Sequence, residues 1–347
     1  MKMKEYPETI ANEAILEELL SEPTVETVRM FSKIEGDILF LGIGGKIGPT
    51  LAMMAKRACV EAGVEKRIYG VSLFESEQQR QKISRIGIET IHGDLLDIDF
   101  IKSLPKVRNV FLLAGMKFGS EENISLTWAV NSFMPALVAD HFKGSNIVAF
   151  STGCVYPLVP VNSGGSLETD PPEPVGEYAQ SCLGRERMFE YGSKKHNSHV
   201  CLIRLNYSVE LRYGVLVDIA VKVKNQEPID LSMGYFNVIW QGDVNNVVLR
   251  SLEICKSPAN ILNITGEETL SVKEVALEFG KLFKVNPKFV NEEAKTALLN
   301  NAQQAFQLFG RPKVSTKQII KWIVGWFGEG RETLGKPTHY EVRDGKY

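Results

Sequence analysis

Three glycines in one short stretch have a spacing that suits phosphate binding. Gly42, Gly45 and Gly48 stand three residues apart, between an apolar run at 38–41 and a helix expected over 50–61. A glycine turn between a strand and a helix directs backbone N–H groups and the positive helix end toward a pyrophosphate. An ordinary glycine-rich loop is the alternative, because a glycine pattern alone is weak evidence of a dinucleotide site.

The elements around this turn alternate between strands and helices. Apolar runs predict strands over 67–74, 88–94, 109–115, 146–150, 200–205, 235–239 and 261–264. Helical spacing predicts helices over 75–82, 97–104, 121–142, 178–191, 215–223, 243–255, 271–283 and 317–327, and residues 157–177 form a surface loop. Strands that are apolar along their length indicate an α/β fold, a doubly wound parallel sheet covered on both faces. Ligands of such sheets bind beyond the carboxyl ends of the strands.

Composition excludes several classes of protein. The chain has 347 residues and a net charge of −2, so no basic excess predicts binding to nucleic acid. It lacks a long apolar run and the apolar core of a signal peptide, so we expect no membrane contact and a cytoplasmic location. Five cysteines without a Cys-x-x-Cys pair indicate reduced thiols. Five histidines without ligand spacing predict no metal site.

Several motifs, in chain order, resemble those of the extended short-chain dehydrogenases/reductases, the NAD-dependent epimerase/dehydratase family. The resemblance covers roughly residues 37–327. It is carried by the turn Gly42–Gly48, Gly93-Asp94-Leu95, Leu113-Ala-Gly-Met-Lys117, Asn131 in the long helix, Ser151-Thr-Gly-Cys-Val-Tyr156, Tyr178, Val238–Asp243 and Ile261–Ile264. It implies a Rossmann domain at 37–205 after an N-terminal helical extension at 1–36. A smaller, mixed and interleaved substrate-binding domain follows at 206–347, with a polar tail from 328.

The same resemblance implies which residues hold the cofactor. They are Gly42, Gly45, Ile47, Gly48, Ser72, Glu75, Asp94, Leu95, Ala114, Gly115, Lys117, Asn131 and Tyr178. An acidic residue usually ends the second strand and binds the ribose 2′-hydroxyl. Here Ser72 stands at that place and Glu75 follows, with no arginine directly after the strand. We therefore expect NAD and keep NADP as the alternative.

The implied catalytic centre departs from the family at one position. The resemblance assigns acid/base chemistry to Tyr178 and a hydrogen bond to the reacting oxygen to Thr152. The family's Tyr-x-x-x-Lys lysine, which lowers the pKa of the tyrosine, is replaced by Cys182. In one interpretation Lys117, Arg185 or the oxidised nicotinamide supplies the missing positive charge. In a second the protein binds the cofactor without hydride chemistry, and in a third Cys182 itself reacts.

The substrate is less well defined by the sequence. The segment after the sixth expected strand, Arg204–Glu210, lacks the Gly-Pro that relatives often carry there. Within the implied class of sugars, nucleotide sugars and sugar acids, this absence argues against a nucleotide sugar. Asn206, Tyr207, Glu210 and Arg212 are candidates to line a pocket for a smaller polyol or sugar acid. Arg212 would pair with a carboxylate or phosphate, or would be an ordinary surface arginine.

Two functions are consistent with these residues. The first is an NAD(P)-dependent epimerase, dehydratase or dehydrogenase that acts on a carbohydrate-like hydroxyl, with Thr152, Tyr178, Lys117 and Cys182 as the candidate catalytic residues. The second is a catalytically degenerate sensor or scaffold that only binds the dinucleotide. The resemblance further implies a homodimer in which the helices at 121–142 and 178–191 pair with their copies. The extension is expected to pack on the main domain, a dimer arm or lid being the alternative.

Overall fold

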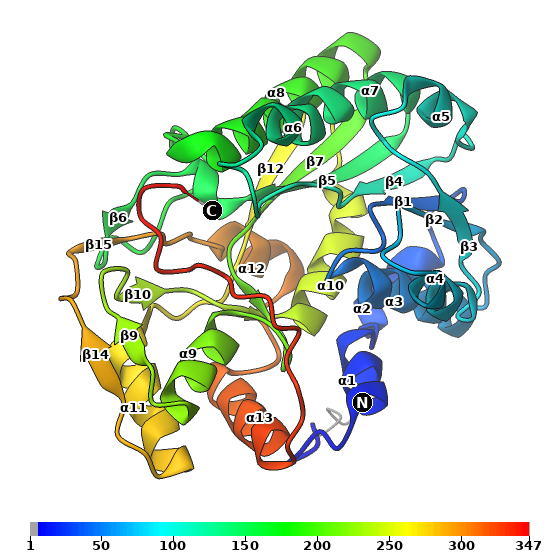
Figure 1. The fold of residues 1–347 in the computed structure, drawn as a ribbon. Coiled ribbons are helices and arrows are strands. Elements are labelled where there is room, and N and C mark those ends of the chain that lie inside the picture. Colours follow the sequence, from blue (N-terminus) through cyan, green and yellow to red (C-terminus); the bar gives the residue numbers. More distant parts are fainter. Residues whose placement is uncertain (1–5, 347) are drawn as a thin grey trace.

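A parallel seven-stranded sheet forms the centre of the molecule (Figure 1). The computed structural model describes residues 6–346. The strand order is β12-β7-β5-β4-β1-β2-β3, and each neighbouring pair is parallel. The strands are β1 (Ile38–Leu41), β2 (Ile68–Ser72), β3 (Glu89–His92), β4 (Asn109–Leu112), β5 (Asn146–Thr152), β7 (His199–Leu205) and β12 (Asn260–Ile264). The predicted alternation of strands and helices is confirmed.

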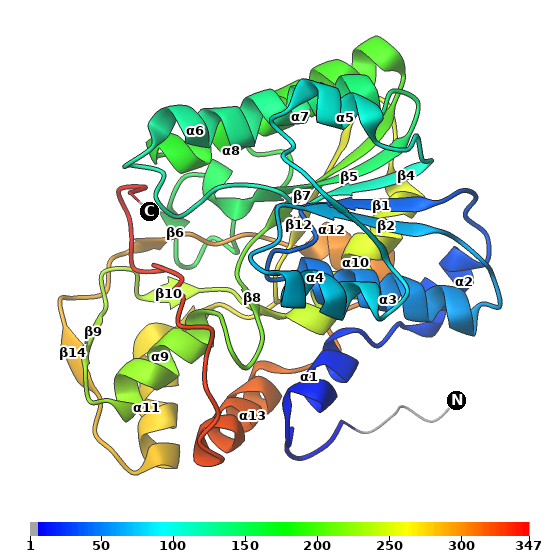
Figure 2. The ribbon, with the colours of Figure 1, turned by 45° about the vertical axis from the view of Figure 1, so that its right-hand side comes forward.

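Helices cover both faces of this sheet, as a doubly wound fold requires (Figures 1 and 2). One face packs against α2 (Val25–Phe31), α3 (Gly48–Glu61), α4 (Glu77–Ser84), α10 (Gln241–Arg250) and α12 (Gln303–Phe309). The other carries α5 (Ile98–Ser103), α7 (Met134–His141) and α8 (Gly176–His196), and α6 (Ile124–Trp128) packs on α8. β1 and β4 are buried at every residue. Their continuous apolar sequence therefore reflects burial on both faces.

A second, smaller lobe lies beside the sheet. Its helices are α1 (Glu13–Leu20), α9 (Val215–Lys224), α11 (Val272–Phe283) and α13 (Thr316–Gly328). Its short strands are β6 (Val159–Pro160), β8 (Ser208–Val209), β9 (Pro228–Asp230), β10 (Tyr235–Phe236), β11 (Ile239–Trp240), β13 (Leu270–Ser271), β14 (Lys288–Val290) and β15 (Thr296–Ala297). Leu16 and Leu20 of α1 join the core of this lobe. Within residues 6–346 no helix combines the length and apolarity that a bilayer crossing needs.

The long helix expected at 121–142 is interrupted. It begins at Ile124, and a π-helical turn at Ala129–Phe133 separates α6 from α7. Pro135 explains the interruption, because its ring clashes with the carbonyl four residues earlier, which belongs to Asn131. That carbonyl instead accepts a hydrogen bond from Arg185 Nε at 3.4 Å. The sequence prediction also missed α12, and it read as loop the segment that contains β6.

A buried ion pair joins α8 to the sheet beside the end of β5. Arg204 of β7 donates from Nη2 and Nε to the two oxygens of Glu186 at 2.7 and 3.0 Å. Both side chains are at most 2% exposed. Ser151 donates to Glu186 at 2.5 Å, and Arg204 donates to the Tyr156 hydroxyl at 2.7 Å. Burial favours loss of the arginine proton, but the Glu186 carboxylate outweighs this effect and raises the pKa of Arg204.

This pairing predicts a large cost for removing one charge. Glu186→Gln leaves the Arg204 guanidinium buried without its counter-charge, which destabilises proteins by about 3–5 kcal/mol. Glu190→Gln is the matched control, because Glu190 pairs with Arg187 on the exposed side of the same helix, where a pair contributes about 0–1 kcal/mol. Urea unfolding followed by circular dichroism measures both. Equal losses would contradict the assigned role of the buried pair.

Candidate active site

One large crevice lies at the carboxyl ends of the parallel strands. Its volume is about 1030 Å³. The predicted site residues on its wall are Gly42, Gly45, Ile47, Gly48, Glu75, Gly115, Lys117, Thr152, Tyr178, Asn206, Tyr207 and Arg212. The glycine turn, the segments after β4, β5 and β7, and the C-terminal segment thus face one space. The volume is large enough for a dinucleotide with a further small molecule.

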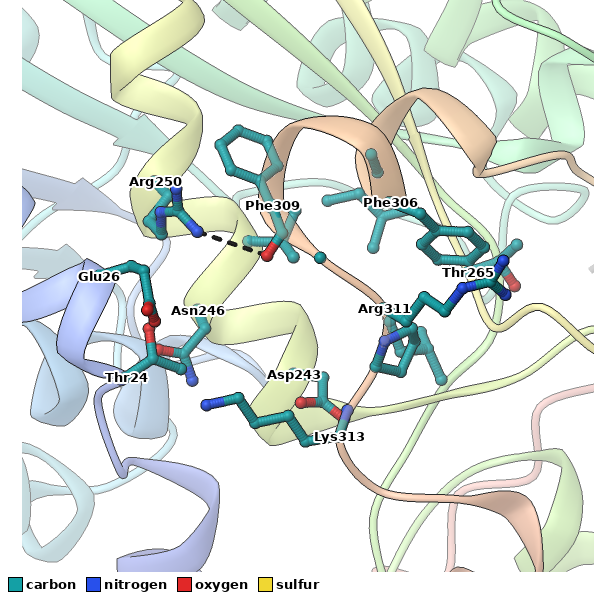
Figure 3. A pocket seen from close by; sticks show the side chains of 16 residues that line it. Thr24, Glu26, Asp243, Asn246, Arg250, Thr265, Phe306, Phe309, Arg311 and Lys313 are labelled. Atoms are coloured by element: carbon teal, nitrogen blue, oxygen red, sulfur yellow. Dashed lines mark hydrogen bonds between the residues drawn. The ribbon is translucent and has the colours of Figure 1, made fainter. Parts of the chain in front are cut away.

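A second cavity is much smaller and lies between α2, α10 and α12 (Figure 3). Its volume is about 50 Å³, room for a few waters at most. Asp243 lines it, and its carboxylate accepts the N–H groups of Lys313 and Val314 at 3.1 Å. Burial raises the pKa of Asp243 to about 6. This cavity is therefore a small packing defect beside the loop at 310–314, whose backbone Asp243 holds, and it is not the candidate site.

The glycine turn has the geometry of a phosphate cradle. Gly42 has φ +89°, and a Cβ there would stand 2.5 Å from the Ala114 nitrogen. A Cβ on Gly48 would stand 2.2 Å from the Ile43 carbonyl oxygen, so only glycine lets α3 begin this close to β1. Gly45 lines the crevice, and a Cβ there would meet the Gly42 carbonyl oxygen at an ordinary 3.6 Å. No side chain caps α3 at Ile47, which leaves its first N–H groups available for an anion.

The end of β2 presents Glu75, not Ser72, to the crevice. Ser72 Oγ accepts the N–H of Phe74 at 3.3 Å and lies beneath Gly44. The backbone of Glu75 is held by Gln79, which also donates to the Gly44 carbonyl at 2.9 Å. Glu75 itself pairs with Lys336 at 3.2 Å. The carboxylate available for a ribose therefore already has a cation beside it.

Lys117, Thr152 and Tyr178 come together on the crevice wall from three different elements. Lys117 Nζ lies 5.8 Å from the centre of the Tyr178 ring. Burial raises the pKa of Tyr178, the thiols of Cys182 and Cys154 raise it further, and a hydrogen bond from Thr152 and the charge of Arg185 lower it. Burial lowers the pKa of Lys117. Both shifts favour the uncharged form of the side chain, so Tyr178 holds its proton more tightly, and Lys117 less tightly, than in water.

Cys182 and Arg185 lie behind this wall. Cys182 is 1% exposed and packs with Val155 and Tyr156, and burial raises the pKa of its thiol to about 11. Arg185 is buried and donates to the Phe150 carbonyl at 2.7 Å and to Asn131 Oδ1 at 2.6 Å. A Cβ on Gly115 would stand 2.6 Å from this guanidinium. Arg185 therefore acts on Tyr178 as a fixed charge at a distance.

Five other predicted cofactor or substrate residues either are engaged by protein groups or do not line the crevice. Asn131 is fully buried, and its amide uses both oxygen and nitrogen on Met116, Ser181 and Arg185. It holds the turn that ends at Lys117. Asp94 accepts the Leu96 N–H on an exposed turn, Leu95 is in the core, and Ala114 packs under Gly42. Arg212 pairs with Glu210, Glu13 and Glu17.

The substrate side of the crevice carries two further polar groups from the segment after β7. Asn206 is buried, with its amide 3.4 Å from the Leu298 carbonyl. Tyr207 has φ +44° and a pKa that burial raises well above its ordinary value. Arg212 lines the same space, but its ion pairs already neutralise it, so it does not offer a free charge.

Two cations that line this space, Lys46 and Lys336, were not predicted from the sequence. Lys46, inside the glycine turn, lies over the Tyr213 ring at 3.8 Å and the Phe118 ring at 4.7 Å. Burial, together with the charges of Lys336 and Lys117, lowers the pKa of Lys46 to about 8. Lys336 belongs to the tail, which has no periodicity. Among residues 6–346 no cluster of side chains is suited to a metal ion.

Comparisons with known proteins agree with the fold. Residues 38–209 match the family model described as NAD dependent epimerase/dehydratase family. No curated protein matches the chain. Three solved structures share the fold. A UDP-glucose 4-epimerase from Thermus thermophilus, solved with NAD, is 18% identical at a TM-score of 0.69, over 84% of this chain and 99% of its own.

The other two have similar coverage. A UDP-glucuronic acid 4-epimerase from Bacillus cereus is 15% identical at a TM-score of 0.70, over 84% of this chain and 99% of its own. A dTDP-glucose 4,6-dehydratase from Streptomyces venezuelae, solved with NAD, is 16% identical at a TM-score of 0.70, over 84% of this chain and 97% of its own.

The burial of Cys182 predicts its chemical behaviour. At pH 7.5 iodoacetamide alkylates the half-buried Cys154, which lines the crevice, while Cys182 stays unmodified because thiolates are the reactive form and its thiol is protonated and enclosed. Mass spectrometry of the digested protein measures both sites. Labelling of Cys182 as fast as Cys154 in the folded protein would revive the interpretation in which Cys182 reacts.

Proposed function

We propose, for a chain that belongs to the NAD dependent epimerase/dehydratase family, that it is an NAD-dependent enzyme acting on a carbohydrate-like hydroxyl. One observation carries this proposal. The glycine cradle and the side chains of Lys117, Thr152 and Tyr178 face the same crevice at the carboxyl edge of the sheet. A site that only bound a dinucleotide would need the cradle but not a hydroxyl, a phenol and an amine at its other end.

The cradle fits the dinucleotide, because the start of α3 has uncapped N–H groups and the backbone of Gly45 lines the crevice beside it. Gly42, Gly45, Ile47 and Gly48 would hold the pyrophosphate, and Glu75 would accept the ribose hydroxyls. Bound there, NAD supplies the hydride chemistry. NADP remains the alternative cofactor, since Lys336 stands beside Glu75.

Three side chains would handle the proton of the reacting hydroxyl. The Thr152 hydroxyl holds the oxygen, and Tyr178 accepts or returns its proton as general acid/base. A phenol buried beside thiols is a poor base unless positive charge is near it. Lys117 at the crevice wall and Arg185 behind it provide that charge. They would replace the lysine that Cys182 displaces, and Cys182 would serve as an apolar filler.

The substrate class follows from the remaining wall. Asn206 and Tyr207 offer hydrogen bonds to hydroxyl groups, as a sugar requires. The related structures are named for UDP-glucose, UDP-glucuronic acid and dTDP-glucose, so a nucleotide sugar or sugar acid is the class to test first. Arg212 is engaged by Glu210, and Lys46 is the cation better placed to meet an anionic group.

A dinucleotide sensor or scaffold is the second candidate, favoured by the loss of the family's lysine at Cys182. Such a protein would bind NADH and turn over no substrate. Cys182→Lys separates the two candidates. It would bring activity to a degenerate site, whereas in a working site it would crowd Lys117 with a second buried charge and lower turnover.

Assembly and location belong to the same proposal. We propose a homodimer, in the cytoplasm, that pairs α6–α7 and α8 with their copies. The described helices present apolar side chains to solvent on this side, namely Ile124, Trp128, Phe133 and Tyr191. Exposed apolar side chains grouped on neighbouring helices are typical of an interface.

The catalytic assignment predicts a split between binding and turnover. Tyr178→Phe and Lys117→Met should each lower turnover about 10²–10⁴-fold, the usual contribution of a positioned acid or base, while NADH affinity changes little. A panel of sugars, nucleotide sugars and sugar acids with NAD and NADP measures turnover, and NADH fluorescence measures affinity. Tyr235→Phe and Lys281→Met, in the second lobe and outside the residues that line the crevice, are matched controls. Unchanged turnover in Tyr178→Phe would remove that residue from the mechanism.

The assembly predicts a change in mass. Phe133, 49% exposed, becomes buried in the proposed dimer, so Phe133→Glu should give a monomer because a charge replaces an apolar contact. Leu282→Glu is the matched control, since Leu282 is 45% exposed on α11, away from this face. Gel filtration with light scattering gives the mass. A wild-type monomer, or a dimer that survives Phe133→Glu, speaks against this interface.

A further inference from the structure

The tail after α13 is packed across the crevice, although it has no regular secondary structure among its described residues. We call residues 331–346 the strap. In Figures 1 and 2 it is the red segment that leaves α13, runs between the two lobes and ends beside the start of α8. Residues 334–339 of the strap line the crevice without a break. The strap is thus one wall of the candidate active site.

Both ends of the strap are anchored. Arg331 N–H donates to the Trp326 carbonyl at 3.2 Å, and Leu334 N–H donates to the Arg212 carbonyl at 2.9 Å. At the far end Arg343 donates to the carbonyl and hydroxyl of Thr296, each at 2.7 Å. Tyr340 is 1% exposed. A segment with this many buried contacts has a single position, unlike a frayed terminus.

The middle of the strap contacts the candidate catalytic lysine. Lys117 Nζ donates to the Thr338 carbonyl at 3.2 Å. Thr338 in turn donates from its N–H and its hydroxyl to one oxygen of Asp218 on α9, at 2.8 and 2.6 Å. Hydrogen bonds to a carboxylate are stronger than neutral ones. The position of the Thr338 carbonyl, and with it that of the lysine, is therefore set by Asp218.

Charged and titratable groups from several elements surround Lys117. They are Asp218 of α9, Glu341 of the strap, the thiols of Cys154 and Cys182, and Lys46 of the glycine turn, with Tyr178 of α8 on the crevice side. Asp218 is the anion that is joined to the lysine through hydrogen bonds. Its carboxylate also favours the charged form of the lysine against the cost of burial.

We infer that the strap is a part of the active site and that Asp218 and Thr338 are positioning residues. Asp218 holds Thr338, and the Thr338 carbonyl holds the Lys117 ammonium beside Tyr178. The charge that the family places on α8 is in this chain supplied from the turn after β4, and the strap keeps it there. This inference rests on the proposed function, because it takes Lys117 as the cation of the site.

The first test measures Lys117 directly and needs no substrate. Trace acetic anhydride labels lysines at a rate proportional to their neutral fraction and exposure, and mass spectrometry reads each site. Asp218→Asn and Thr338→Val should raise the labelling rate of Lys117 at pH 7 about tenfold, because the first removes a carboxylate that favours the charged ammonium and the second removes the hydroxyl that ties Thr338 to that carboxylate. Asp344→Asn and Thr333→Val, in the same strap but away from Lys117, are matched controls and should change the rate less than twofold.

The second test separates positioning from general stability. Introduced alone, Asp218→Asn should lower turnover on the substrate that the sugar panel identifies, while NADH affinity stays within twofold. In the Lys117→Met background it should cause no further loss, since residues that act through one another are not additive. Equal losses in both backgrounds, or an unchanged Lys117 labelling rate in folded Asp218→Asn, would overturn the inference. Full activity of Lys117→Met would instead overturn the proposed function.

Discussion

The buried pair between Glu186 and Arg204 constrains the whole carboxyl edge of the sheet. Two charges taken out of water are tolerated only if every lone pair and proton finds a partner. Here the partners are Ser151 at the end of β5, Tyr156 after it, and the two charges themselves on α8 and β7. The network therefore fixes where β5 ends and how α8 lies on the sheet. Thr152 follows Ser151, and Tyr178 lies in the first turn of the helix that carries Glu186. The positions of the two candidate catalytic side chains therefore depend on this charge pair.

A second constraint is the absence of lysine where the family has one. A buried phenol beside thiols has a raised pKa and needs positive charge before it can exchange a proton at neutral pH. Lys117 and Arg185 stand where they can provide it, the first on the crevice wall and the second behind it. Asn131 links them, because its amide accepts hydrogen bonds from Arg185 and from the Met116 N–H. The π-helical turn at Ala129–Phe133 also leaves the Asn131 carbonyl to accept a hydrogen bond from Arg185 Nε at 3.4 Å.

The crevice is closed by parts of the chain that are distant in sequence. Glu75 after β2 meets Lys336 of the strap, Lys46 of the glycine turn meets Tyr213, and Lys117 meets Thr338. Each contact joins the sheet domain to the second lobe or the strap. A dinucleotide bound in the crevice would thus contact or lie beside the segment after β2, the glycine turn and the turn after β4. The strap meets the first and the last of these through Lys336 and Thr338.

The sequence by itself determined the parallel sheet, the glycine cradle and the line of segments after the strands, because local apolar patterns and glycine spacing are properties of neighbouring residues. It also placed Lys117, Thr152 and Tyr178 among the candidates. Only the tertiary structure decided that Arg212 is neutralised by Glu210, that Asn131 binds protein and not the crevice, and that Lys46 and the strap face the site. The strap contact shows this most clearly, because Lys117 and Thr338 are 221 positions apart in the sequence. A segment without regular secondary structure has no hydrophobic periodicity, so the sequence pattern could not predict where the tail packs.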